Sequence, residues 1–395
     1  MNRKKMKMGK ASSNKYIPPE ILTQILVNLP AKSLLKFRCV GKTWCSIIDN
    51  PDFVSIHHQF CKNNNSNLIK LLDLECLVPP RGYSGCLLAL RKSDKRRKIG
   101  QIFKSNETYY LHGTCHSLLF VSPSKALFYG WFRLCNPSIK KSLRLPLCPL
   151  LSCSGYHYFT FVLGFAANTG DYKVIAISFE SNLDVEIPKK RVMVYTLSDH
   201  QWAARDNGLN NIDCLRYEHL FGPYYFCEGA AHWLGKDPYE DTSNQDDKPT
   251  HLVSLDFDTE SFTFLELPHA LDEVDTIISR SLFLLGESLA TFCISSVSFK
   301  IWVLKQQSGK REWTLWFSGP SSSDGFDLFY YMGSTTNRVL YCESDGGRLV
   351  YKEYSYNITT CQVQLLGKSM SRYVEPVKYS ENLVLCNRDG TEDMV

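Results

Sequence analysis

The stretch that decides the fold is residues 17–53, IPPEILTQILVNLPAKSLLKFRCVGKTWCSIIDNPDF. Apolar residues recur in its first part at the i, i+3, i+4 spacing of an amphipathic helix. They are Ile21, Leu22, Ile25, Leu26 and Leu29. Pro18 suits the start of this helix, where a missing N–H costs nothing, and Pro30 ends it. Two more short helices are expected over residues 31–37 and 38–48, so the stretch predicts a small three-helix unit.

The apolar surface of this unit is larger than the unit can bury. Asn50-Pro51 is expected to end the third helix. A chain of about forty residues buries only ~60% of its surface, so some apolar side chains are expected to stay exposed until a partner covers them. The alternative is a helical unit that docks on the rest of its own chain. Periodicity alone leaves both interpretations open.

The order of residues in this stretch resembles the F-box motif, over its whole length and without a gap. Two departures are mild: Ile17 stands where Leu is commoner, and Gly41 stands where Ser often precedes the Lys. The resemblance implies docking on a Skp1-type adaptor of a cullin–RING ubiquitin ligase, with no catalytic role. The residues expected to bind the adaptor are Ile17, Pro18, Ile21, Leu22, Ile25, Leu26, Pro30, Val40, Lys42 and Trp44. For some of them, Trp44 above all, packing inside the F-box is the alternative.

The composition is that of a globular protein. The 395 residues are 44% apolar and 22% charged, and the 13% of aromatic residues favours β-structure. No apolar run reaches the ~18–20 residues that a membrane span needs, and the basic start lacks the apolar stretch of a secretory signal. The 15 cysteines form no C-x-x-C pair, which favours reduced, core-filling thiols. We therefore expect a cytoplasmic or nuclear protein.

Charge is unevenly distributed along the chain. Residues 1–100 hold 19 Lys and Arg against 6 Asp and Glu, whereas residues 101–395 carry a net charge of −8. Much of the basic excess lies in residues 3–10 and 91–98. A solvated tail and a solvated loop are favoured over nucleic-acid binding, because no nucleic-acid motif accompanies the charge.

The rest of the chain predicts many short strands. From Leu68 on, apolar runs of four to eight residues alternate with Gly, Pro, Asn, Asp and Ser. Hairpins are expected at residues 131–146, 192–202, 252–268, 299–316 and 349–366, each preceded by another pair of apolar runs. This gives five units of four strands between Gly113 and Gly367, the size of propeller blades.

A sixth unit would close the ring with strands from both ends of the chain. It would pair residues 68–74 or 99–111 with the tail residues 373–377 and 383–385, and closure would remove open sheet edges. The expected fold class is α+β multidomain, a small three-helix F-box followed by an all-β propeller-like domain. A β-sandwich is the alternative.

The repeats resemble the plant F-box-associated domain of type 1, often described as kelch-like. His112–Leu119 is similar to its "GSCNGLL" opening, with His116-Ser117 in place of Asn-Gly. Further matches follow in the same order: Asn136-Pro137-Ser138 with Leu145-Pro146, Leu163-Gly164-Phe165, Asp171–Val174, Val194-Tyr195 with Trp202, Gly229–Leu234, Ser254–Phe257 and Ile301–Val303 with Trp313. The resemblance covers nearly the whole chain and implies a module that binds the substrate of the ligase.

No catalytic constellation stands out. The ten histidines form no metal-binding motif; His112, Cys115 and His116 are close in sequence but favour a strand-end turn over a zinc site. His232 lies in an apolar run and is best interpreted as a core histidine. The acidic residues of 237–249 favour a solvated loop over a carboxylate pair. We expect no metal, no cofactor and no enzymatic activity.

The expected organisation is a basic tail (1–14), an F-box (15–58), a linker (59–67) and an F-box-associated domain (68–395). As the resemblance implies, the protein would be the substrate-recognition subunit of an SCF ubiquitin ligase, linked through the adaptor to cullin and RING subunits. Its target is not identifiable; candidate target-binding loops are 152–157, 237–249 and 318–327. The alternative is a stand-alone propeller that binds a partner or acts on carbohydrate, with its helices docked intramolecularly.

Overall fold

The computed structural model describes residues 17–64, 69–74, 86–92, 95–101, 109–123, 131–152, 157–180, 190–205, 209, 212, 221–236, 249–268, 277–285, 287–295, 298–307, 309–320, 330–335, 338–345, 348–357, 360, 362–369, 377–378 and 380–394. The predicted basic tail and most of the candidate target-binding loops lie outside these residues. Residues 17–64 contain four α-helices, one more than predicted. They are α1 (Pro19–Val27), α2 (Ala31–Phe37), α3 (Lys42–Ile48) and α4 (Pro51–Asn64).

Prolines set the helix boundaries. Pro19 is the first residue of α1, and Pro30 is the N-cap of α2. The expectation that Asn50-Pro51 only ends a helix was incomplete, because this pair also begins α4. The Asn50 Oδ1 atom accepts a hydrogen bond from the Asp52 N–H at 2.8 Å, as an N-cap residue does, and Pro51 needs no partner for its missing N–H.

Two predicted boundaries near these helices were wrong. The third helix begins at Lys42 rather than Arg38, because residues 38–40 form a turn. Residues 59–64, expected to be a polar linker, continue α4. Polar residues are compatible with this helix because one of its sides faces solvent.

The strands described in residues 69–393 form six antiparallel sheets, five of them four-stranded. The first combines β1 (Ile69–Leu74), β2 (Cys86–Lys92) and β3 (Lys95–Gln101) with β24 (Val377–Lys378). The second combines β4 (Tyr109–Cys115), β5 (Leu118–Pro123), β6 (Arg133–Asn136) and β7 (Lys141–Arg144) with β25 (Thr391–Asp393). A short 3-10 helix, η2 (Pro149–Ser152), follows the second sheet.

The remaining four sheets each consist of four consecutive strands. The third holds β8 (His157–Ala166), β9 (Asp171–Glu180), β10 (Lys190–Thr196) and β11 (Gln201–Ala204). The fourth holds β12 (Phe221–Cys227), β13 (Ala230–Gly235), β14 (His251–Asp256) and β15 (Ser261–Glu266). The fifth holds β16 (Ile277–Leu285), β17 (Ser288–Ser295), β18 (Ser298–Gln307) and β19 (Lys310–Pro320). The sixth holds β20 (Tyr330–Thr335), β21 (Arg338–Asp345), β22 (Arg348–Asn357) and β23 (Gln362–Ser369).

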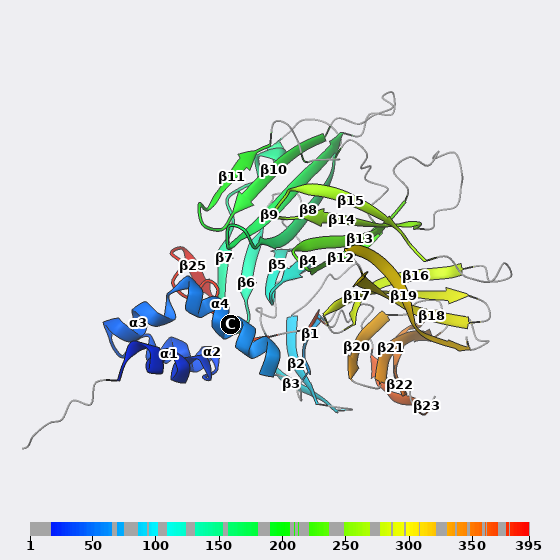
Figure 1. Ribbon diagram of the computed structural model, residues 1–395, viewed down its shortest axis with the longest axis horizontal. Helices are drawn as coiled ribbons and strands as arrows, with labels where there is room; N and C mark the ends of the chain where they lie inside the picture. The colour runs from blue at the N-terminus through cyan, green and yellow to red at the C-terminus, as the bar shows by residue number, and fades with distance from the viewer. Residues whose placement is uncertain are drawn as a thin grey trace, which may run out of the picture.

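This arrangement is that of a propeller-like domain with six blades in the described part of the chain (Figure 1). The five predicted hairpins are confirmed, and β24 pairs with β1 as closure of the ring requires. The second tail strand was misplaced: residues 383–385 lie at a turn, and β25 instead pairs with β7. The basic residues 91–98, expected in a loop, lie in the β2–β3 hairpin.

The F-box helices lie on one face of the propeller, which we call the turn face (Figure 1). The tight turns at 116–117, 197–200 and 287 lie on this face. Glu287 pairs with Lys62 of α4, and Ser117 contacts Ser380, which itself contacts His58 of α4. Ser198 contacts Arg388, whose neighbour Asn387 contacts the end of α3. Because the strands of each sheet are antiparallel, their other ends point away from the helices. The described ends flanking 153–156, 181–189 and 237–248 belong to that opposite face. Within the described residues, no helix is long and apolar enough to span a membrane.

Candidate functional site

Helix α1 has one buried and one exposed apolar side. Leu22 and Leu26 are 6% and 0% exposed and belong to the core of the helical unit. Ile21 and Ile25, one helical turn apart, are 47% and 49% exposed, and Ile17 just before the helix is also exposed. We call Ile17, Ile21 and Ile25 the isoleucine row. Half-exposed isoleucines on a well-packed helix form the kind of apolar surface that a partner covers.

The other predicted adaptor-binding residues fall into two groups. Pro18, Pro30 and Lys42 are exposed, and Val40, at 63%, is the most exposed large apolar residue among those described. Trp44 is half-buried and stacks on Phe37, with ring centroids 5.2 Å apart. The structure thus places Leu22 and Leu26 inside the helical unit, leaves Trp44 partly inside it, and exposes the other seven predicted residues.

A polar cluster ties the end of α3 to α2. The Arg38 guanidinium donates to both carboxylate oxygens of Asp49, at 2.8 Å for the Nη2 contact, and the Cys45 thiol donates to the same carboxylate at 3.3 Å. Burial would raise the pKa of Asp49, but the hydrogen bonds from Arg38 and Cys45 outweigh it and hold that pKa below its usual range. The carboxylate therefore stays ionised and holds the turn between the two helices.

Helix α4 was not predicted, and it carries the contact between the helical unit and the propeller. Phe53 and His57, one turn apart, are buried, and the His57 ring contacts the Leu29 carbonyl oxygen at 2.9 Å. His58 faces the His116 ring, with centroids 5.1 Å apart. The Asn50-Pro51-Asp52 cap and the spacing of Phe53 and His57 were the sequence signals for this helix.

The helical unit and the propeller share one hydrophobic core. Leu34, Ile48 and Phe53 of the helices belong to the same cluster as Leu143 of the second sheet and Tyr195 of the third. Such continuity favours a fixed association over a flexible tether.

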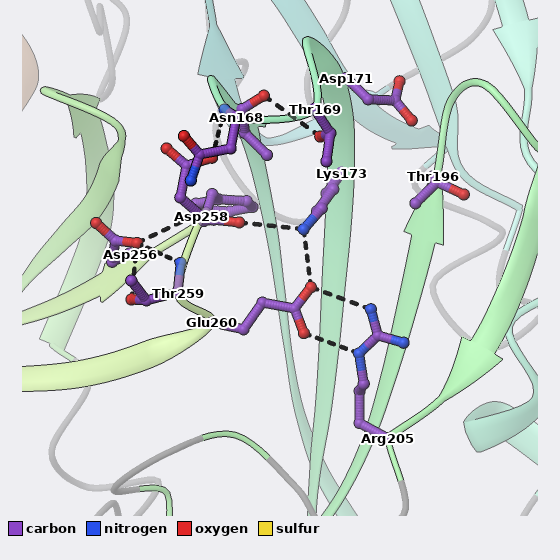
Figure 2. A network of polar contacts seen from close by, with 12 residues as sticks. Asn168, Thr169, Asp171, Lys173, Thr196, Arg205, Asp256, Asp258, Thr259 and Glu260 are labelled. Carbon is purple, nitrogen blue, oxygen red and sulfur yellow. Dashed lines mark hydrogen bonds and ion pairs between the residues drawn. The ribbon is translucent and has the colours of Figure 1, made fainter.

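An ion-pair network joins the third and fourth sheets (Figure 2). Glu260 accepts from the buried Lys173 ammonium at 2.8 Å and from the Arg205 guanidinium at 2.8 and 3.1 Å. Lys173 also donates to the Phe257 carbonyl oxygen at 3.1 Å. The hydrogen bond from Arg205, followed by that from Lys173, lowers the pKa of Glu260 to about 2 against the opposing effect of burial. Both Glu260 oxygens thus accept from side chains of the third sheet or its end, so the network holds the third and fourth sheets together.

His112 and His232 each make hydrogen bonds within the propeller, whereas the acidic residues of the 237–249 run lie outside the described residues. His112 contacts Ser122 Oγ at 2.7 Å and has a pKa of about 4 because of burial. His232 is confirmed as a core histidine, bonded to Ser254 Oγ at 2.8 Å and to the Cys227 carbonyl oxygen at 3.3 Å. Within the described residues, no group of three or more His, Cys, Asp and Glu side chains could hold a metal ion.

Comparison with known families gives the class of the molecule. Residues 16–55 match the F-box domain, and residues 92–384 match the F-box associated beta propeller domain. The second match covers well over half of the chain, so this protein belongs to the F-box proteins that carry an F-box associated beta propeller domain. The two segments agree with the helical unit and the sheets described above.

Similar proteins include F-box proteins of a plant. The F-box protein CPR1 of Arabidopsis thaliana is 26% identical over 76% of this chain and 72% of its own length. The F-box/kelch-repeat protein At3g23880 of the same plant is 23% identical over 78% of this chain and 80% of its own. Among solved structures, an oligogalacturonate lyase in complex with manganese is 12% identical over 76% of this chain and 78% of its own, with a TM-score of 0.39.

Proposed function

We propose that this protein is the substrate-recognition subunit of a Skp1–cullin–F-box ubiquitin ligase. The observation that carries the proposal is the isoleucine row: Ile21 and Ile25 remain about half exposed although the adjoining Leu22 and Leu26 of α1 are buried. Together with Val40 and the exposed prolines, this row supplies the apolar surface that an adaptor would cover. The buried Leu22 and Leu26 support this surface from inside rather than contact the adaptor.

The mechanism would be proximity rather than chemistry on this chain. The F-box would hold the protein on the ligase, and the propeller would bind a target, so that target lysines meet the ubiquitin-carrying enzyme at a high effective concentration. The F-box helices occupy the turn face, which leaves the opposite face for the target. Two of the candidate loops, 152–157 and 237–249, have described anchoring strand ends on that face. On this proposal the protein itself is not an enzyme.

The test is adaptor binding by the full-length protein, measured by calorimetry against a plant Skp1-like protein. Ile21→Ala/Ile25→Ala should weaken binding by more than about tenfold, since each lost side chain removes roughly 1 kcal/mol of burial. The matched control is Leu147→Ala/Leu365→Ala, which trims two equally exposed leucines on the propeller. Leu22 is unsuitable for this test because its truncation would leave a cavity in the helical core.

Three results are informative. Loss of binding by the isoleucine variant alone, with unchanged thermal unfolding, supports the proposal. Equal adaptor affinity of both variants would mean that the adaptor binds a surface other than the isoleucine row of α1. A folded wild-type protein that does not bind the adaptor would refute the ligase role and leave the propeller as a stand-alone binding protein.

A further inference from the structure

The C-terminal segment 380–388 lies between the F-box and the propeller and contacts both. On the F-box side, the Glu381 carboxylate accepts a hydrogen bond from the backbone N–H of Ala31, the first residue of α2, at 2.9 Å. The Asn387 amide donates to the Asp49 carbonyl oxygen at 3.4 Å. His58 of α4 contacts the Ser380 hydroxyl at 3.0 Å. This short segment therefore contacts three of the four helices or their immediate ends.

On the propeller side, the segment is held by two fully buried asparagines. The Asn136 amide donates to Asn382 Oδ1 at 2.5 Å and to the Val384 carbonyl oxygen at 2.6 Å. The Asn382 amide donates to the His116 carbonyl oxygen at 3.0 Å, and its backbone N–H donates to Ser138 Oγ at 3.1 Å. Because the Asn136 and Asn382 side chains are both excluded from water, breaking the hydrogen bonds of either one would leave unpaired buried amide groups.

Apolar side chains of the same segment complete the shared core. Leu383, Leu385 and Cys386 are 0%, 4% and 7% exposed. They belong to the cluster that holds Leu34 of α2 and Leu143 of β7. Removing the segment would therefore expose apolar surface on both the helices and the propeller.

The turn at His116-Ser117 has an unfavourable backbone conformation, and its contacts with segment 380–388 offset that cost. His116 and Ser117 have φ values of 47° and 65°, in the left-handed region where a residue with a side chain is disfavoured by ~1–2 kcal/mol. An Asn-Gly pair would adopt this turn more easily. In return, Ser117 Oγ accepts a hydrogen bond from the Ser380 N–H at 2.9 Å, and the His116 ring packs on His58. The strained pair thus makes contacts that Asn-Gly would not.

We propose that segment 380–388 and the His116-Ser117 turn form a fixed joint that sets the orientation of the F-box on the propeller. One side of the joint holds α2, α3 and α4, and the other holds the second sheet, so the two parts move as one body. A consequence rests on the proposed function: the joint fixes the distance between the adaptor surface and the target face. The joint itself does not depend on that function.

The experiment measures the distance distribution between the two parts. Spin labels are introduced through non-natural amino acids at the exposed residues Ser46 on α3 and Gln306 on β18, which avoids the native thiols, and pulsed electron resonance gives the distribution. The wild-type protein should give one narrow peak. His116→Asn/Ser117→Gly should broaden it at least twofold while the unfolding temperature stays equal or rises, because the turn itself is relieved.

A control variant in an equivalent turn and a second variant in the joint are measured in the same way. Glu228→Asn changes the first residue of the equivalent turn between β12 and β13, also at positive φ, and should leave the peak narrow. Asn382→Ala should broaden the peak through the other half of the joint. A broad wild-type peak, or narrow peaks in both joint variants, would overturn the inference. All variants should keep adaptor affinity, so a failure of the proposed function appears separately as absent binding by wild type.

Discussion

At the scale of single residues, two glycines determine how closely the inner strands approach. A methyl group added at Gly113 of β4 would overlap the Tyr224 ring, and one added at Gly164 of β8 would overlap the Phe257 ring. The Tyr224 hydroxyl accepts a hydrogen bond from the Leu163 N–H at 2.7 Å, so this ring links β12 to β8 while it packs on β4. The ring cannot move aside without losing that bond.

Gly113→Ala should therefore lower the free energy of unfolding by about 2 kcal/mol, within the usual range for overpacked cores. Urea denaturation followed by tryptophan fluorescence measures the change. Gly41→Ala is the control, because its added methyl meets only Trp44, at 4.0 Å. A loss at Gly113 no larger than that at Gly41 would show that the blades have room at this contact.

Glu260 is the second decisive single residue. Glu260→Gln should leave the buried Lys173 ammonium without its ionic partner and lower the free energy of unfolding by about 2 kcal/mol, less than for a fully buried pair because Arg205 remains partly in water. The exposed Glu312→Gln serves as control. Equal unfolding free energies for the two variants would contradict the structural role of the network.

The same network predicts an acid dependence. The pKa of Glu260 is about 2 in the folded state, below its ordinary value of 4.5, so the ionised form is favoured by folding. Its stabilisation is complete above pH 4.5 and is lost as the pH falls toward 2. Between these limits, unfolding of the wild type should depend more steeply on pH than unfolding of Glu260→Gln, as measured by urea titrations at each pH.

At the scale of elements, the sequence predicted those helices and strands that have a periodic apolar pattern. The apolar spacing from Ile21 to Leu29 predicted α1, and the alternation of apolar runs with turn residues predicted the five hairpins. It could not separate the two sides of α1, because Leu22 and Ile21 are equally apolar and only packing decides which is buried. The predicted adaptor-binding set therefore mixed core residues with surface residues.

Helix α4 was missed because its start resembles a helix end. Asn-Pro stops α3, but Asn50 is also an efficient N-cap. Asn50→Ala should lower the free energy of unfolding by about 1 kcal/mol, whereas Asn50→Asp, which keeps the acceptor oxygen, should not. Hydrogen exchange at Asp52 reports the cap directly. Unchanged exchange in Asn50→Ala would mean that α4 begins without its help.

At the scale of the whole molecule, long-range pairing was only partly predictable. The closure of the first sheet by β24 follows from the need to cover open edges, whichever tail residues supply the strand. The burial of Leu383 depends on where the F-box docks, because Leu383 shares a cluster with Leu34 of α2. No local pattern encodes that contact, because Asn382 and Asn136 are separated by most of the chain.

The joint between F-box and propeller should be sensitive to acid. Burial lowers the pKa of both His58 and His116 to about 4. Lys62 lowers both pKa values further and Glu287 opposes this, while His57 lowers the pKa of His58 and His58 lowers that of His116. Tyr172 also faces His116, with its hydroxyl 3.4 Å from the ring nitrogen. Both histidines are neutral in the folded joint.

The sign of the effect follows from these values. An unfolded histidine binds its proton near pH 6.5, so the neutral pair stabilises the folded state fully above that pH and loses its contribution as the pH falls toward 4. At pH 5.5 the loss should be about 1 kcal/mol per histidine. The distance distribution between the spin labels of the wild-type protein should therefore broaden when the pH is lowered from 7.5 to 5. The same pH change should broaden the distribution of His58→Gln/His116→Asn less. An equal pH response in both proteins would place the acid sensitivity in other buried histidines, such as His112 and His232, rather than in the joint.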